Sequence, residues 1–206
     1  MINDKYINSE RIRRIIEFHF DKNNEIFSVN NSFSTYDFSY NYFIKVFDHL
    51  RDKNENDYHQ WIVIGSSIVY SWMPTILNFS KGSEKKSDYN TQLSRAQSAL
   101  EKIEKKIISQ KSTFFDPSLL TDLNIIVSFI NNSVVGTSKF LHFSFPNHYP
   151  IWDSRVELAT RFDINDPMKK LSRSNHRTKS IENYILYLNV IHDIIKNHKP
   201  FLEKCF

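Results

Sequence analysis

The sequence predicts a mainly α-helical protein, and two observations support this class. Glycine occupies only three of the 206 positions, which is too few for the many turns of an all-β protein. Apolar residues recur every three or four positions along most of the chain, which is the period of a helix with one buried face. The length allows one sizeable core or two small lobes that share a cleft, and we expect a single domain over residues 1–206 with helical lobes at about 1–110 and 111–206.

The helices expected in the first half follow one another with clear start and stop signals. Ser9 is a candidate N-cap for a first helix, and a second helix is expected over about 38–50. A third starts near Tyr58, is apolar almost all round, and should end or kink at Pro74. The polar segment 81–88 is expected to form an exposed loop.

A long amphipathic helix over about 93–107 is expected to complete the first lobe. Asp116 and the proline after it mark the start of another helix, which should stop at Asn131-Asn132. Gly136 is expected to turn the chain into a short helix. The final helices are expected over about 153–163 and 180–198.

Composition restricts the class of protein further. Hydrophobic residues make up 40% and charged residues 24%, which is ordinary for a globular protein. No apolar run approaches the roughly 20 residues that cross a bilayer, and the N-terminus does not resemble a signal peptide. The single cysteine, Cys205, has no partner within the chain. These observations predict a cytoplasmic protein without membrane contact.

Residues 134–156 carry the most informative chemistry. They combine Gly136 with Asp153, a carboxylate placed where a helix is expected to start after a Pro-Ile-Trp run. Aspartate at a helix start is a good N-cap, and this role alone would account for it. A carboxylate fixed in that position can also stabilise positive charge on a substrate. The pattern leaves both roles open for Asp153.

The run Ile151-Trp152-Asp153-Ser154-Arg155-Val156 resembles the Val-Asp-Thr/Ser-His/Arg-Val motif of the helix-hairpin-helix DNA glycosylase superfamily. The wider wording SKFLHFSFP…YPIWDSRV is closest to the prokaryotic proteins with the oxoguanine-glycosylase fold. The motif match covers about residues 118–163. The resemblance implies a helix-hairpin-helix fold and a DNA glycosylase that releases a flipped-out damaged or modified base, such as a modified phage base.

The same resemblance implies that Asp153 stabilises the oxocarbenium ion and activates water. Two departures from the family motif bear on the reaction. Val134 replaces the first hairpin glycine, and Ser138 occupies the position of the nucleophilic lysine of bifunctional members. Lys139 is one residue further on, about 100° around a helix. We therefore expect a monofunctional enzyme, with Lys139 as a phosphate contact, a surface lysine or a lyase nucleophile.

The resemblance also suggests which residues surround the base and the DNA. His142 and His148 have no third ligand at metal-binding spacing and no iron–sulfur motif is present, so no metal or cofactor is expected. The expected partner is double-stranded DNA, bound by a monomer. The candidate residues of the base pocket are Trp72, Phe140, His142, Phe143, Tyr149 and Trp152. The candidate DNA contacts are Val135, Gly136, Ser138, Lys139, Ser154, Arg155, Lys169, Lys170, Arg173 and Arg177.

Two other functions fit the sequence. A non-catalytic factor that keeps the glycosylase fold and binds DNA or protein, for example in phage–host conflict, is favoured by the altered hairpin and by Ser138. A helical regulator without a DNA role is the third interpretation. DNA binding that did not weaken with salt would support it, because phosphate contacts depend strongly on salt.

Overall fold

The structure, a computed structural model, describes residues 7–20, 34–53, 58–71, 73, 76–79, 89–109, 116–161, 165–166 and 175–197. Within these ranges it contains helices and no β-strand, which confirms the mainly α-helical class. None of the helices in the described ranges has the length and apolarity to span a membrane. The elements are α1 (Ser9–Phe20), α2 (Ser34–Lys53), α3 (Tyr58–Ser71), α4 (Tyr89–Ser109), the 3₁₀ helix η3 (Pro117–Leu119), α5 (Leu120–Phe129), α6 (Val134–Ser144), α7 (Ser154–Thr160), α8 (Asn175–Lys179) and α9 (Ile181–Asn197).

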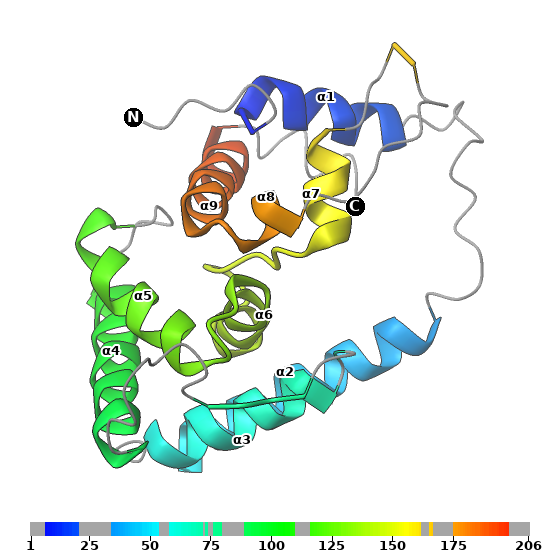
Figure 1. Cartoon of the computed structure of the whole chain (residues 1–206). Helices are drawn as coiled ribbons and strands as arrows, with labels where there is room; N and C mark the ends of the chain where they lie inside the picture. Colours follow the sequence, from blue (N-terminus) through cyan, green and yellow to red (C-terminus); the bar gives the residue numbers. More distant parts are fainter. Residues whose placement is uncertain are drawn as a thin grey trace.

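The helices form two groups with α6 between them (Figure 1). Helices α2, α3, α4 and α5 pack together on one side, and α1, α7, α8 and α9 on the other. The expected division at about residue 110 therefore does not match the packing, because α1 contacts α7 and α9. Ile12 and Ile15 of α1 are buried, and Arg11 Nε donates to the carbonyl oxygen of Thr160 at 2.9 Å. These contacts place α1 with the C-terminal helices.

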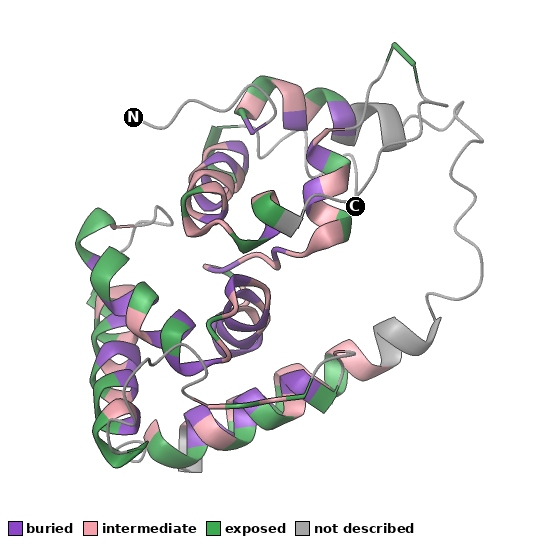
Figure 2. Cartoon of the chain, in the orientation of Figure 1, coloured by how far each residue is buried: buried purple, intermediate pink, exposed green. Residues whose placement is uncertain are grey.

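Helix α6 contributes much of the core. Its rings at Phe140 and Phe143 are 0% and 1% exposed and pack against Phe47 of α2. Trp61 of α3 is also buried, and its indole N–H donates to the hydroxyl of Ser144 at 3.2 Å. Figure 2 shows buried residues around much of α6, whereas other helices keep an exposed face. Full burial of an aromatic side chain stabilises the fold by about 1.5–3 kcal/mol, so α6 is a central element.

The helix starts agree in part with the sequence signals. Asp116 caps η3 as expected, because its carboxylate accepts the N–H of Ser118 at 2.8 Å. The expected capping role of Ser9 is wrong: the side chain of Asn8 accepts the N–H of Arg11 at 2.9 Å, and Ser9 is the first helical residue. Helix α2 begins at residue 34 rather than near 38. The expected loop at 81–88, Trp72 and Pro74 lie outside the described residues.

The turn between α5 and α6 lies earlier than expected. The left-handed backbone conformations fall on Asn131 (φ 57°) and Asn132 (φ 50°), and asparagine tolerates this region better than most residues. Helix α6 begins at Val134, so the expectation that Gly136 forms the turn is wrong. Gly136 instead allows a close approach of Tyr70, whose hydroxyl oxygen would lie 2.5 Å from a Cβ at this position.

Candidate functional site

The α5–α6 turn is braced by residues 76–79. The side-chain oxygen of Asn131 accepts the N–H of Asn78, and its amide nitrogen donates to the carbonyl oxygen of Ile76 at 2.8 Å. Phe79 forms an isolated antiparallel bridge with Ile130. The turn is thus held by a second segment of the chain, which fixes where α6 begins.

At the start of α6, some backbone N–H groups have a hydrogen-bond acceptor within the protein and others have none in the described residues. The N–H of Ser133 donates to Ile130, and that of Gly136 donates to the Ser133 hydroxyl at 3.0 Å. Among the described residues, no acceptor is found for the N–H groups of Val134 and Val135. Such groups at a helix start favour an anion. Val135 therefore retains the donor that a phosphate contact requires, whereas the N–H of Gly136 is already bonded.

Asp153 is the N-cap of α7. One carboxylate oxygen, Oδ1, accepts the N–H groups of Arg155 and Val156 at 2.9 and 3.0 Å. The other oxygen, Oδ2, lies 3.7 Å from the ammonium nitrogen of Lys139. The capping role is therefore confirmed, and it leaves the second oxygen directed at a lysine. A cap that holds the carboxylate through one oxygen also orients the other.

Lys139 lies against this carboxylate rather than on the open surface. The side chain of Lys139 is 12% exposed and that of Asp153 is 22% exposed. Ser138, one position earlier in α6, is buried and bonds to the backbone of Trp152. The rotation of about 100° between successive helical residues therefore directs Lys139 toward Asp153. The alternative of a plain surface lysine is wrong.

Burial changes the acid–base properties of Lys139. Burial lowers the pKa of Lys139, and the positive charge of Arg155 lowers it further, while the carboxylate of Asp153 raises it. The net direction is downward, so a larger fraction of the amine is unprotonated near neutral pH than for a free lysine. The separation of 3.7 Å is that of an ion pair rather than of a short hydrogen bond. An unprotonated amine beside a carboxylate can act as a nucleophile with a neighbouring base.

Tyr187 of α9 is a further residue near the carboxylate, and the sequence patterns did not reveal it. Its ring centroid lies 5.1 Å from that of Trp152. Burial raises the pKa of the Tyr187 hydroxyl, and the negative charge of Asp153 raises it further. The hydroxyl is thus protonated at neutral pH. Tyr187 occurs within the apolar pattern of the last helix, so no local signal distinguishes it from a core residue.

The predicted base pocket is mostly core. Phe140, Phe143, Tyr149 and Trp152 are between 0% and 4% exposed, so these rings offer no accessible stacking surface. His142 is also engaged: Nδ1 donates to the carbonyl oxygen of Tyr149 and Nε2 lies 2.7 Å from the hydroxyl of Tyr40. Burial lowers the pKa of His142, which keeps it neutral. Trp72, the remaining candidate, lies outside the described residues.

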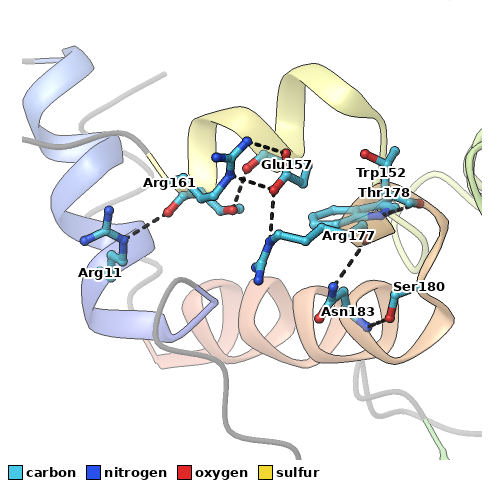
Figure 3. Close-up of polar contacts among 9 residues, drawn as sticks. Arg11, Trp152, Glu157, Arg161, Arg177, Thr178, Ser180 and Asn183 are labelled. Atoms are coloured by element: carbon cyan, nitrogen blue, oxygen red, sulfur yellow. Dashed lines mark hydrogen bonds and ion pairs between the residues drawn. The ribbon is translucent and has the colours of Figure 1, made fainter. Parts of the chain in front are cut away.

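The structure does not bring the predicted DNA-contact residues together at one site. Ser154 and the exposed Arg155 lie in the first turn of α7, beside Asp153. Arg177 instead pairs with Glu157, whose fully buried carboxylate accepts Arg177 Nε at 2.9 Å and Arg161 Nε at 2.7 Å (Figure 3). This ion pair links α8 to α7 through Nε of Arg177. Lys169, Lys170 and Arg173 lie outside the described residues.

The part of the chain that the structure describes contains no group of three or more His, Cys, Asp or Glu side chains placed to hold a metal ion. Comparisons with known proteins identify no relative of this chain. No family model matches it, and no curated protein or solved structure matches it significantly.

Proposed function

We propose that this protein is a DNA glycosylase that cleaves the N-glycosidic bond of a flipped-out damaged or modified base. The observation that carries this proposal is the Asp153–Lys139 pair at the start of α7, with 3.7 Å between the carboxylate oxygen and the amine. The resemblance of residues 151–156 to the helix-hairpin-helix glycosylase motif supports the same assignment. The two helices α5 and α6, joined by a tight turn just before the pair, are consistent with it.

The carboxylate of Asp153 suits this reaction. Breaking the bond between base and sugar places positive charge on the sugar ring. A carboxylate held in advance stabilises that charge without the cost of reorienting during the reaction. The two backbone N–H groups that cap α7 hold Oδ1, so Oδ2 has a fixed direction. In this proposal Oδ2 is the oxygen that faces C1′ of the flipped nucleotide.

The position of Lys139 favours attack by an amine over the expected attack by water. The lone pair on Nζ forms a bond to C1′, and the electrons of the breaking C1′–N bond leave with the base, which takes up a proton. The amine gives up a proton in the same process, and Asp153 Oδ2 is the nearest carboxylate oxygen that can receive it. The lowered pKa of Lys139 increases the unprotonated fraction of the amine, which is the form that this route needs.

DNA binding in this proposal uses the start of α6 and the first turn of α7. The N–H groups of Val134 and Val135 have no intramolecular acceptor in the described residues and suit a phosphate oxygen. Arg155, in the first turn of α7, adds positive charge next to Asp153. The net charge of +4 is compatible with a polyanionic partner.

The proposal is tested by incubating the protein with normal, oxidised and phage-modified DNA and identifying free bases by mass spectrometry. Asp153→Asn is the informative variant, because asparagine is also a good N-cap and preserves the start of α7. We expect this variant to lose base release while its circular dichroism spectrum and DNA affinity stay at the wild-type values. Full activity of Asp153→Asn would show that the mechanism is wrong.

A non-catalytic DNA- or protein-binding role is the second candidate, and one observation favours it. Four of the rings expected to line the base pocket, including Phe140 and Trp152, lie in the core. The two candidates differ in the same experiment. A non-catalytic factor would bind DNA with salt-dependent affinity and release no base from any of the three substrates.

A further inference from the structure

We propose that Ser138 is the positioning residue of this site, because its hydroxyl group sets the distance between Lys139 and Asp153. The meaning of that distance for catalysis rests on the proposed function. The link itself is a set of hydrogen bonds between α6 and the segment that precedes α7, and it can be tested without a substrate.

The Ser138 hydroxyl lies within hydrogen-bonding distance of both the backbone N–H and the carbonyl oxygen of Trp152. Its oxygen accepts the N–H of Trp152 at 3.1 Å and lies 2.9 Å from the carbonyl oxygen of the same residue. The carbonyl oxygen of Val135 is also 2.9 Å away, so the one hydroxyl proton has two possible acceptors. Ser138 and Trp152 are both 0% exposed, so these bonds are shielded from bulk solvent.

These hydrogen bonds affect the distance between Lys139 and Asp153 because each of these residues is next in the sequence to a bonded residue. Lys139 follows Ser138, and Asp153 follows Trp152, so joining residue 138 to residue 152 brings the next two residues together. The side chain of Trp152 is also held in place, since its indole N–H donates to the carbonyl oxygen of Thr178 at 3.1 Å (Figure 3). Residue 152 is thus held between α6 and α8. The N-cap fixes Asp153 relative to α7, and Ser138 fixes this segment relative to Lys139.

Alanine at position 138 removes the link and retains both the N-cap of α7 and the hydrogen bond of the Trp152 indole. The N–H of Trp152 loses its side-chain acceptor, and the segment before α7 is no longer bonded to α6 through this group. Ser144→Ala is the matched control. Ser144 is a buried serine of the same helix, and its hydroxyl accepts a hydrogen bond from Trp61 of α3 rather than from the segment before α7.

The first measurement is the pKa of Lys139 in protein labelled with ¹³C at the lysine ε-carbon, followed by NMR during a pH titration. Lys139→Arg identifies the signal. In Ser138→Ala we expect a lower pKa of Lys139 than in the wild type, because Asp153 and Arg155 move away together with the start of α7 and Asp153 raises this pKa more than Arg155 lowers it. Ser144→Ala is expected to leave the pKa of Lys139 unchanged, and Ser138→Cys, with a weaker donor and acceptor, to give an intermediate value.

The second measurement is base release. Ser138→Ala is expected to reduce the rate at saturating DNA by about 10–100-fold, with an unchanged Kd for DNA, since small misplacements of reacting groups have effects of this size. An unchanged pKa of Lys139 in both Ser138→Ala and Ser138→Cys would overturn the inference, as would an equal shift in Ser144→Ala. The NMR result needs no DNA. A wild-type protein that releases no base would therefore overturn the proposed function alone.

Discussion

The buried ion pair behind the candidate site allows a quantitative prediction. Glu157 is 0% exposed, and its two carboxylate oxygens accept three hydrogen bonds from the guanidinium groups of Arg161 and Arg177 (Figure 3). The change Glu157→Gln keeps the size of the side chain and removes its charge. The new amide N–H₂ is a donor that faces other donors, so at least one guanidinium N–H group loses its acceptor.

The expected loss follows from burial. Removing one partner of a buried ion pair typically costs about 3–5 kcal/mol, because the remaining charge is left without compensation. The side chains of Arg161 and Arg177 are 15% and 18% exposed, so they retain some contact with water. We therefore expect the lower part of the range, about 3–4 kcal/mol. For a chain of this size that corresponds to a decrease in Tm of about 6–16 °C.

Thermal and urea unfolding followed by circular dichroism measure this loss. Glu10→Gln is the matched control, because the Glu10–Arg13 pair has a similar distance of 3.0 Å and Glu10 is 67% exposed. The control is expected to change the free energy of unfolding by less than about 1 kcal/mol. If Glu157→Gln is as stable as Glu10→Gln, the ion pair does not stabilise the packing of α7 on α8 and the reasoning from burial is refuted.

Two further predictions concern stability. Gly136→Ala is expected to lower the free energy of unfolding in urea by about 1–3 kcal/mol, because a Cβ would lie 2.5 Å from the Tyr70 hydroxyl oxygen; a variant of wild-type stability would contradict this contact. Burial lowers the pKa of His142 and of His192, so below a pH of about 6.5 the unfolded chain binds more protons than the folded protein. The urea midpoint should therefore fall as the pH is lowered from about 7.5 to 5.5, and a flat or rising midpoint would count against buried neutral histidines.

The sequence predicted the features that depend on local signals. The stop at Asn131-Asn132 and the cap at Asp153 are set by side chains that bond to nearby backbone or tolerate its conformation, and both are confirmed. Asp116 is a third example, with its proline at the first turn of η3. Such signals act over a few residues, so they can be read without knowing the fold.

The features that the sequence did not predict depend on contacts between distant residues. Gly136 was expected to form a turn, whereas its lack of a side chain makes room for Tyr70, 66 positions earlier. Tyr187 comes near Asp153 only through the packing of α9. The direction of Lys139 depends on where α6 begins, and an error of one residue in that start rotates every side chain by about 100°.

Reduction with borohydride during incubation with a modified DNA, followed by intact mass and peptide mapping, tests whether Lys139 and Asp153 carry the reaction. We expect a covalent protein–DNA adduct on Lys139, its loss in Lys139→Met, and a large decrease in both adduct and released base in Asp153→Asn. Base release by Asp153→Asn at the wild-type rate, or an adduct formed at a different lysine, would contradict the assignment of the reaction to the Lys139–Asp153 pair.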